Sequence, residues 1–211
     1  MSKVTKQQNF WQSDFGKNYS SRNTWDPATM DEIYKETYGV TRTEMNNEFI
    51  KNLPIQNILE VGCNVGDQLR FLQSGGFENL FGIEIQADAV EKSKQLTTNI
   101  NIIRASAFDI PFKDSYFDLV FTSGVLIHIS PKDIKDAMAE IYRVSKEYIW
   151  GFEYFSEQYE EIEYHRQKDY LWRANFPQIF INMYPNLKLI KVKKIPYIGN
   201  SNVDVMYLLK K

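Results

Sequence analysis

The chain has 211 residues, of which 43% are hydrophobic and 25% are charged, and its formal net charge is -2 at pH 7. This length allows one well-filled α/β domain and is too short for two ordinary ones. The composition excludes a disordered chain, and no run approaches the roughly 18 consecutive apolar residues of a membrane span. The small negative charge argues against a nucleic-acid partner that needs a broad basic surface.

Cysteine and histidine are scarce in this chain. Cys63 is the single cysteine, which excludes an intramolecular disulfide. One cysteine and two histidines do not favour a structural zinc site, so we expect no metal. The polar residues 1–15 lack the apolar core of a secretory signal peptide. These features favour a reducing, cytoplasmic setting without a membrane partner.

The sequence divides into three zones, of which the first is helical and the second is an α/β core. Residues 1–54 are polar, aromatic and helical in pattern, and they predict an N-terminal helical cap. Residues 55–152 alternate short apolar runs with helical segments, which is typical of a parallel sheet with crossover helices. We expect strands at residues 57–61, 80–85, 101–104, 118–122 and 148–152. We expect helices at residues 67–74, 87–96 and from just after Pro131 to about Val144.

The third zone adds an insertion and two strands. Residues 153–186 are predicted to form an insertion that begins with an acidic and aromatic stretch. Residues 187–192 and 203–209 are predicted strands, and with no helix between them they form an antiparallel hairpin that turns near residues 196–200. The sequence thus predicts a single Rossmann-like, doubly wound α/β domain. Its seven-stranded sheet is mostly parallel, with the hairpin at one edge.

A glycine loop follows the first predicted strand. Gly62 permits a tight turn and lets a ligand lie against bare backbone, and Gly66 lets the next helix begin close to the sheet. Such a loop lies at the topological switch point, where open α/β sheets bind ligands. A dinucleotide site has G-x-G-x-x-G, but Asn64 replaces the second glycine and Glu60 precedes the loop. A carboxylate there favours an ammonium or sulfonium group over a pyrophosphate.

A second acid, Glu84, ends the second predicted strand. An acid roughly 20 residues beyond the glycine loop is placed to accept two ribose hydroxyl hydrogens. Two structural alternatives stay open: Glu60 caps a helix or meets a lysine, and Glu84 is a solvated strand end.

These residues resemble the class I methyltransferases that depend on S-adenosylmethionine. The matching segments run in chain order over about residues 57–152 and comprise residues 58–66, 82–85, 105–112, 117–120 and 123–128. The resemblance implies S-adenosylmethionine as the cofactor, with S-adenosylhomocysteine as the product. It also implies that the insertion at residues 153–186 forms a lid over the acceptor site. It implies a cofactor site formed by Glu60, Gly62, Cys63, Asn64, Glu84, Ile85, Ser106, Ala107, Phe108, Ser123, Gly124 and Val125. Ser106 departs from the aspartate of many relatives, so its contact with adenine has less charge assistance.

Both ends of the chain have a narrower resemblance, to methylases associated with pseudaminic acid biosynthesis. It rests on residues 10–23 and on residues 171–176 and 184–189. It implies a sugar-related acceptor, and it favours a cap in which Trp11, Tyr19 and Arg22 fold over the cofactor, with Arg22 on the methionine carboxylate. The alternative is a helix that packs on the domain by its aromatic face.

Methyl transfer from a sulfonium needs alignment and, for some acceptors, a general base. His128 is the candidate base, because its ordinary pKa of about 6.5 suits proton transfer at neutral pH; the alternative is a packing or helix-capping role. Glu153, Tyr154, His165 and Arg173 are candidates for the acceptor site. For Arg173, salt bridges with the acidic residues 160–163 are an equal alternative to an acceptor contact.

The sequence therefore predicts a methyltransferase that acts on a small metabolite, a sugar or a nucleotide-linked sugar acid, at oxygen or nitrogen. Methylation of a protein or an RNA is the second hypothesis. A partner protein that binds the cofactor without catalysis is the third, and the glycine spacing argues against an NAD oxidoreductase.

Overall fold

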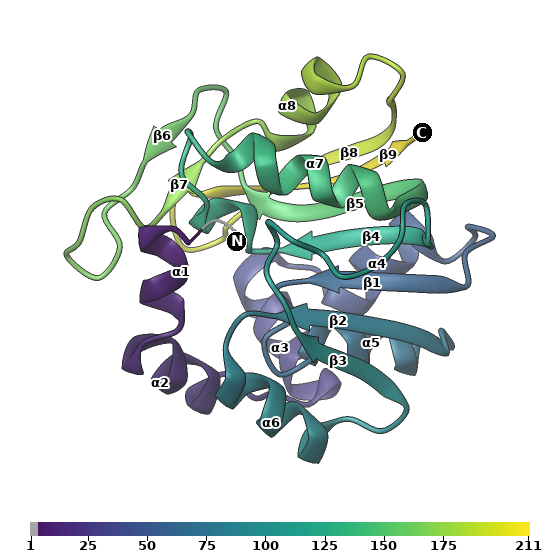
Figure 1. The fold of residues 1–211 in the computed structure, drawn as a ribbon, viewed down its shortest axis with the longest axis horizontal. Coiled ribbons are helices and arrows are strands. Elements are labelled where there is room, and N and C mark those ends of the chain that lie inside the picture. The colour runs from purple at the N-terminus through teal and green to yellow at the C-terminus, as the bar shows by residue number, and fades with distance from the viewer. Residues whose placement is uncertain (1–3) are drawn as a thin grey trace.

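The computed structural model describes residues 4–211, so residues 1–3 of the predicted cap lie outside the described part (Figure 1). A seven-stranded sheet has the order β3-β2-β1-β4-β5-β9-β8. Its strands are β1 (Asn57–Val61), β2 (Asn79–Glu84), β3 (Ile100–Arg104), β4 (Phe117–Ser123), β5 (Ser145–Tyr154), β8 (Lys188–Pro196) and β9 (Val203–Lys210). Neighbours among β1 to β5 are parallel, whereas β9 is antiparallel to both β5 and β8. The predicted doubly wound fold with its edge hairpin is confirmed.

Each face of the sheet carries its own hydrophobic core. One core joins the sheet to α7 (Ile134–Val144) and α8 (Phe176–Met183), and the other joins it to α4 (Arg42–Ile50) and α5 (Asp67–Ser74). Because both faces are covered, the central strands are continuous apolar runs rather than alternating ones. This is why β1 and β4 were recognisable in the sequence.

Three elements of the insertion were not predicted. Helix α8 begins after Asn175, whose side chain accepts from the Gln178 amide, and has a proline in its first turn. The strands β6 (Glu160–Glu161) and β7 (Trp172–Arg173) pair antiparallel outside the main sheet. A two-residue strand has no detectable period, and α8 has only 8 residues, so the sequence pattern gives each of them little weight.

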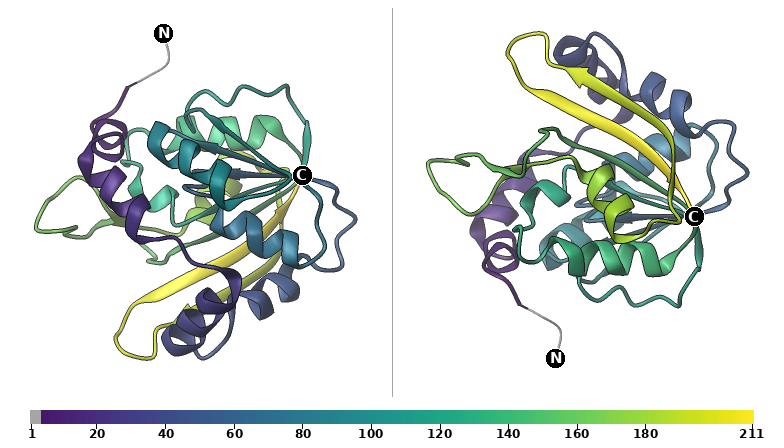
Figure 2. Two further views of the ribbon diagram at one scale, coloured as in Figure 1. Left: turned by 90° about the horizontal axis from the view of Figure 1, so that it is seen from below. Right: turned by 90° about the horizontal axis from the view of Figure 1, so that it is seen from above.

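The N-terminal zone is helical, as predicted, with α1 (Lys6–Trp11), α2 (Asp14–Arg22) and α3 (Pro27–Tyr38) preceding α4. Helix α6 (Ala87–Leu96) follows β2, and the short helix η1 (Leu126–His128) follows β4. Figures 1 and 2 show α1, α2 and the β6–β7 insertion at the end of the sheet to which the parallel strands point. That is the end at which such sheets bind ligands. No helix within residues 4–211 has the length and apolarity needed to cross a bilayer.

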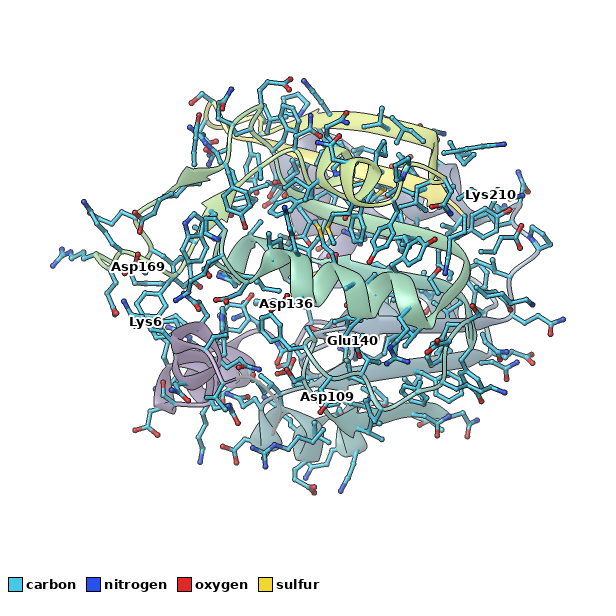
Figure 3. All side chains as sticks on the ribbon, turned by 45° about the horizontal axis from the view of Figure 1, so that its top comes forward. Lys6, Asp109, Asp136, Glu140, Asp169 and Lys210 are labelled. Carbon is cyan, nitrogen blue, oxygen red and sulfur yellow. The ribbon has the colours of Figure 1, made fainter. Side chains whose placement is uncertain are left out.

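The N-terminal helices and the insertion are tied together directly. Lys6 Nζ lies 3.1 Å from Asp169 Oδ2, a pair labelled in Figure 3, and Gln7 Nε2 donates to the Asp169 carbonyl at 2.8 Å. Both charged side chains are more than half exposed, so the ion pair itself contributes little free energy. The rings of Phe10 and Tyr170 stack beside it with centroids 4.2 Å apart.

Close packing inside the sheet makes one glycine essential to stability. A β-carbon on Gly151 of β5 would overlap the ring of Tyr207, which is fully buried in β9. We expect Gly151→Ala to lower the free energy of unfolding by about 1–3 kcal/mol or more, because overpacking displaces neighbouring groups. Urea unfolding measures this, with Gly199→Ala as the control, since nothing lies within 4 Å of a β-carbon there. Equal stabilities of the two variants would contradict this packing.

Candidate functional site

One cavity of about 590 Å³ is lined by the carboxyl ends of parallel strands and by residues of the N-terminal helices. It brings together most of the site residues that the sequence predicted. These are Trp11, Tyr19, Glu60, Gly62, Cys63, Asn64, Glu84, Ile85, Ser106, Ala107, Phe108, Ser123, Gly124, Val125, His128, Glu153 and Tyr154. Arg22, His165 and Arg173 are not among its lining residues.

The glycine loop is built from close backbone contacts. Gly62 has a φ of 75°, and a β-carbon there would lie 2.7 Å from a methyl group of Val125. The amides of Gly62 and Cys63 both donate to the Ile83 carbonyl, at 2.8 and 3.0 Å. The loop after β1 is thereby fixed between β2 and the loop after β4. Cys63 is buried and its pKa is raised by burial, which fits a contact residue rather than a nucleophile.

Glu84 is held by backbone donors from two elements. Its Oε2 accepts from the Asn64 amide and its Oε1 from the Gln86 amide, each at 2.9 Å. Burial raises the pKa of this carboxyl, and those amide donors oppose the rise. Glu84 is therefore not a solvated strand end. Each of its oxygens keeps a lone pair for a ligand hydroxyl.

Glu60 lies deeper in the same cavity and is 2% exposed. Its Oε2 has no hydrogen-bond partner within residues 4–211. Burial raises the pKa of Glu60 strongly, and the charge of Arg42, itself fully buried, opposes the rise. The cavity therefore contains an uncompensated acceptor where the sequence predicted a site for a cationic group.

Ser106 makes contacts that change its expected role. Its hydroxyl oxygen accepts from Gln8 Nε2 at 2.7 Å and from the Phe108 amide at 3.1 Å. The Gln8 amide is oriented by the capping box of α1, in which its Oε1 accepts from the Thr5 amide. With both lone pairs occupied, Ser106 can donate its hydrogen to a ring nitrogen but cannot accept from an amino group. A contact of Ser106 with adenine would therefore be one in which the hydroxyl donates, and this contact stays a prediction.

His128 lies at the end of η1, half-buried in the cavity lining. Its Nδ1 is 2.8 Å from the Tyr170 carbonyl, so this nitrogen carries the hydrogen and Nε2 keeps a lone pair. Burial lowers the pKa of His128 to about 4, although the bond to Tyr170 opposes this change. The expectation of an ordinary pKa was wrong, because the ring is shielded by Trp11, whose centroid is 4.7 Å away. At neutral pH His128 is uncharged.

The pKa of Glu153 is shifted upward, in contrast to that of His128, and lies closer to neutral pH. It is 1% exposed and lines the cavity, and burial raises its pKa to about 7. Its oxygens accept from the amides of Val125 and Ile127, at 3.2 and 3.4 Å. Glu153 therefore holds the loop after β4 in place and titrates near neutral pH.

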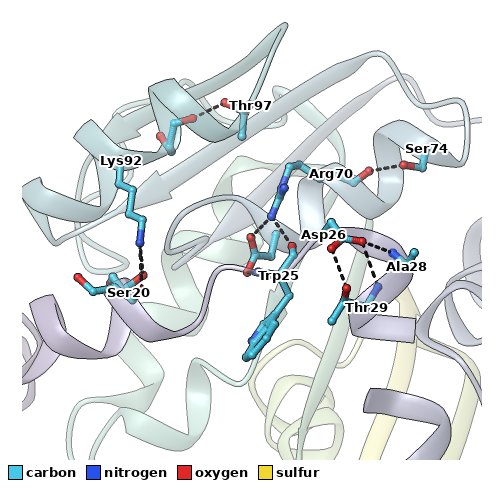
Figure 4. A network of polar contacts seen from close by, with 12 residues as sticks. Ser20, Trp25, Asp26, Ala28, Thr29, Arg70, Ser74, Lys92 and Thr97 are labelled. Atoms are coloured by element: carbon cyan, nitrogen blue, oxygen red, sulfur yellow. Dashed lines mark hydrogen bonds and ion pairs between the residues drawn. The ribbon is translucent and has the colours of Figure 1, made fainter. Parts of the chain in front are cut away.

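The cap is anchored to the α/β core through polar contacts (Figure 4). Lys92 Nζ donates to the Ser20 carbonyl at 3.2 Å, and Arg70 donates to the Trp25 carbonyl and to Asp67. Gln86 Nε2 also donates to the Trp11 carbonyl, at 3.2 Å. These bonds join α1, α2 and the segment after α2 to α5, to α6 and to the residue before α6.

The three candidates outside the lining are surface groups. Arg22 is exposed at the end of α2, although its charge acts on the pKa values of Tyr19 and Tyr164, which do line the cavity. Arg173 Nε lies 2.7 Å from Glu160 Oε2. This is the salt bridge that the sequence offered as the alternative to an acceptor contact. His165 is exposed, and its ring lies against Phe15 with centroids 5.2 Å apart.

Several residues of the cavity lining were not predicted from the sequence. They include Gln8, Tyr34, Tyr38, Tyr197 and Asp204. Asp204 was detectable, because it is an acid inside an otherwise apolar strand, β9. The tyrosines come from α3 and from the β8–β9 turn, and no local pattern connects those segments.

Residues 59–148 match the family model described as "Methyltransferase domain". The chain is 32% identical over 109 residues to 24-methylenesterol C-methyltransferase 2 of Arabidopsis thaliana, across 49% of this chain and 30% of that protein. It is 28% identical over 125 residues to O-methyltransferase rstn1 of Aspergillus nomiae, across 56% of this chain and 54% of that protein. The chain therefore spans only part of the length of these relatives.

Solved structures share the fold across nearly the whole chain. A protein from Pyrococcus horikoshii OT3 superposes with a TM-score of 0.70 at 17% identity, covering 94% of this chain and 98% of that one. The 1,6-didemethyltoxoflavin-N1-methyltransferase of Burkholderia thailandensis, with S-adenosylhomocysteine bound, has a TM-score of 0.68 at 13% identity, covering 100% and 92%. The domain match supports the enzyme class predicted from the motifs, and these likenesses show the methyltransferase fold.

Docking of the cap depends on Gly16 in α2. A β-carbon there would overlap the Trp11 carbonyl and lie 2.6 Å from Gln86 Nε2. We expect Gly16→Ala to displace α1 and α2, so that their amides exchange hydrogen at least about tenfold faster while those of the central strands do not. Hydrogen–deuterium exchange measures this, with Lys17→Ala as the control, whose ion pair to Asp88 is exposed. Unchanged protection in Gly16→Ala would contradict the docking.

Proposed function

We propose that this chain is a methyltransferase that uses S-adenosylmethionine. The observation that carries the proposal is a pair of acids, the buried Glu60 and the half-buried Glu84, which line one cavity beside the glycine loop. A cationic amino-acid moiety and a ribose together present the complementary groups. The methyltransferase domain match over residues 59–148 agrees with this assignment.

The residues present fit this cofactor. Glu84 would accept hydrogens from the ribose hydroxyls, and the unpartnered Oε2 of Glu60 would face the methionine ammonium, directly or through water. Gly62, Cys63 and Asn64 would hold the methionine part, bordered by Ser123, Gly124 and Val125. Ile85, Ala107 and Phe108 would pack on the adenine, and Ser106 would donate to a ring nitrogen. When bound, the cofactor supplies a methyl group already activated by its positive sulfur.

The cap completes the enclosure in this proposal. Trp11 and Tyr19 line the cavity from α1 and α2. Arg22 stays the proposed partner of the methionine carboxylate, which it would reach by turning from its exposed position at the cavity rim. A water-excluding cover strengthens each polar contact beneath it.

The charge of the cavity bears on the acceptor. Five acidic residues line it, namely Glu60, Asp67, Glu84, Glu153 and Asp204, and no lysine or arginine within residues 4–211 does so. This charge favours a neutral or cationic small molecule over a sugar acid or another anion. A sugar-related acceptor, and with it the narrower resemblance to pseudaminic acid methylases, stays a prediction, and the acidic lining argues against its sugar-acid form.

Proton removal, where the acceptor requires it, has two candidate groups. His128 presents a neutral Nε2 that can accept a hydrogen bond. Its low pKa makes it a weak base, whereas Glu153, with a pKa of about 7, is better matched to proton transfer at neutral pH. Glu153 and Tyr154 remain the proposed acceptor contacts from β5.

Calorimetry with S-adenosylmethionine and S-adenosylhomocysteine tests the cofactor assignment. We expect Glu84→Ala to weaken binding of both ligands by about 1.5–3 kcal/mol, as for loss of a hydrogen bond to a charged group. Glu78→Ala, which removes an exposed carboxylate near the other end of β2, should bind like the wild type. Absence of binding by a well-folded wild type would refute the proposed function.

A further inference from the structure

The cavity has an aromatic region that the cofactor site does not explain. Its side chains come from α3, from the end of β5 and from the β8–β9 hairpin. They are Tyr34, Tyr38, Phe152, Tyr154, Tyr197 and Asp204. None of these elements belongs to the glycine loop or to the strand end that carries Glu84.

Asp204 is an unusual residue for its position. It lies in β9 between Tyr154 of β5 and Ile195 of β8, and it is fully buried. Alternation along the strand places it on the same face as Met206 and Leu208, which belong to the core beneath α4 and α5. Burying a carboxylate among such neighbours costs free energy unless it is paired.

Only one half of this carboxylate is paired. Tyr38 OH donates to Asp204 Oδ2 at 2.6 Å, and Tyr197 OH lies 3.0 Å from Tyr38 OH. Asp204 Oδ1 has no hydrogen-bond partner among the residues that the structure describes. Burial raises the pKa of Asp204 to about 6, so the group is mostly ionised at neutral pH. An unpaired, negatively charged acceptor therefore lines the cavity.

Arg42, a buried cation whose charge acts on Asp204, forms no ion pair with it among residues 4–211. Its Nε donates to Asn46 at 2.9 Å and its Nη1 to Tyr34 OH at 3.2 Å. Its guanidinium lies 4.6 Å from the ring centroid of Phe152. Arg42 has the smallest effect on the pKa of Asp204 among the groups that shift it.

Aromatic rings cluster around Tyr38, whose hydroxyl holds this carboxylate. The ring of Tyr38 contacts those of Tyr34, Phe152 and Tyr197, with centroids 5.3, 5.9 and 4.8 Å away. Tyr154 closes the group, 6.4 Å from Tyr197. Aromatic faces attract cations and pack well against flat apolar groups. A carboxylate within such walls is complementary to a protonated or hydrogen-bearing nitrogen.

We propose that Asp204 and these rings form the binding pocket for the methyl acceptor, and that the acceptor is a small amine with an apolar or aromatic body. The inference rests on the proposed function and deepens it by naming the acceptor class. Asp204 binds and orients the amine through an N–H···Oδ1 hydrogen bond. Tyr38 keeps the carboxylate oriented by its bond to Oδ2.

Binding of matched probes to the protein saturated with S-adenosylhomocysteine tests this pocket. Three aromatic groups of different size are each tested as an amine, as an alcohol and as a carboxylic acid. For one of these groups the three probes are tyramine, tyrosol and 3-(4-hydroxyphenyl)propionate. For at least one group, we expect the amine to bind more tightly than the acid by about tenfold or more. Asp204→Asn should remove this preference, while the exposed Asp88→Asn should keep it.

The outcomes separate this inference from the proposed function. Binding of S-adenosylhomocysteine by the wild type and by Asp204→Asn, with loss of the amine preference only in the variant, supports the pocket. Equal or tighter binding of the acids, or binding of no amine, overturns it while the cofactor assignment stands. Failure of the wild type to bind S-adenosylhomocysteine overturns both. If Asp204→Asn unfolds, Tyr38→Phe replaces it and should weaken the amine preference without loss of the fold.

Discussion

The carboxylate of Glu84 connects the parts of this molecule that form the cavity. Its two oxygens accept hydrogen bonds from the backbone amides of Asn64 and Gln86. Asn64 lies in the loop after β1, and Gln86 is the residue before α6. Gln86 then continues the connection outward, because its side chain donates to the Trp11 carbonyl and accepts from Ser20. One strand-end acid thus positions the glycine loop, the start of α6 and the cap. A ligand that hydrogen-bonds to Glu84 would contact the centre of this network.

The cavity contains acidic side chains in two different surroundings. Glu60 and Glu84 lie beside a tight glycine turn, where bare backbone leaves room for a ligand. Asp204 lies among aromatic rings that come from α3, β5 and the β8–β9 hairpin. Each acid keeps acceptor capacity that the described residues do not use. Buried acids of this kind cost stability, and a bound cation or hydrogen-bond donor recovers part of that free energy.

The sequence predicted the part of the site that is local along the chain. The loop from Glu60 to Gly66 and the acid at Glu84 are contiguous with strands that are apolar on both sides, so their pattern is strong. The Tyr38–Asp204 pair joins residues 166 positions apart, and only the folded sheet brings α3 to β9. The pKa of His128 and the occupied lone pairs of Ser106 depend on Trp11 and Gln8 in the same way. Tertiary contacts of this kind leave no local period or spacing.

A crystal structure of the protein grown with S-adenosylhomocysteine tests the central claim most directly. The account predicts the ligand in the 590 Å³ cavity, with its ribose hydroxyls on Glu84 and its homocysteine part on Gly62 and Asn64. The rings around Asp204 should then remain open to the space beside the sulfur. A ligand bound elsewhere, or a ribose without contact to Glu84, would contradict the account.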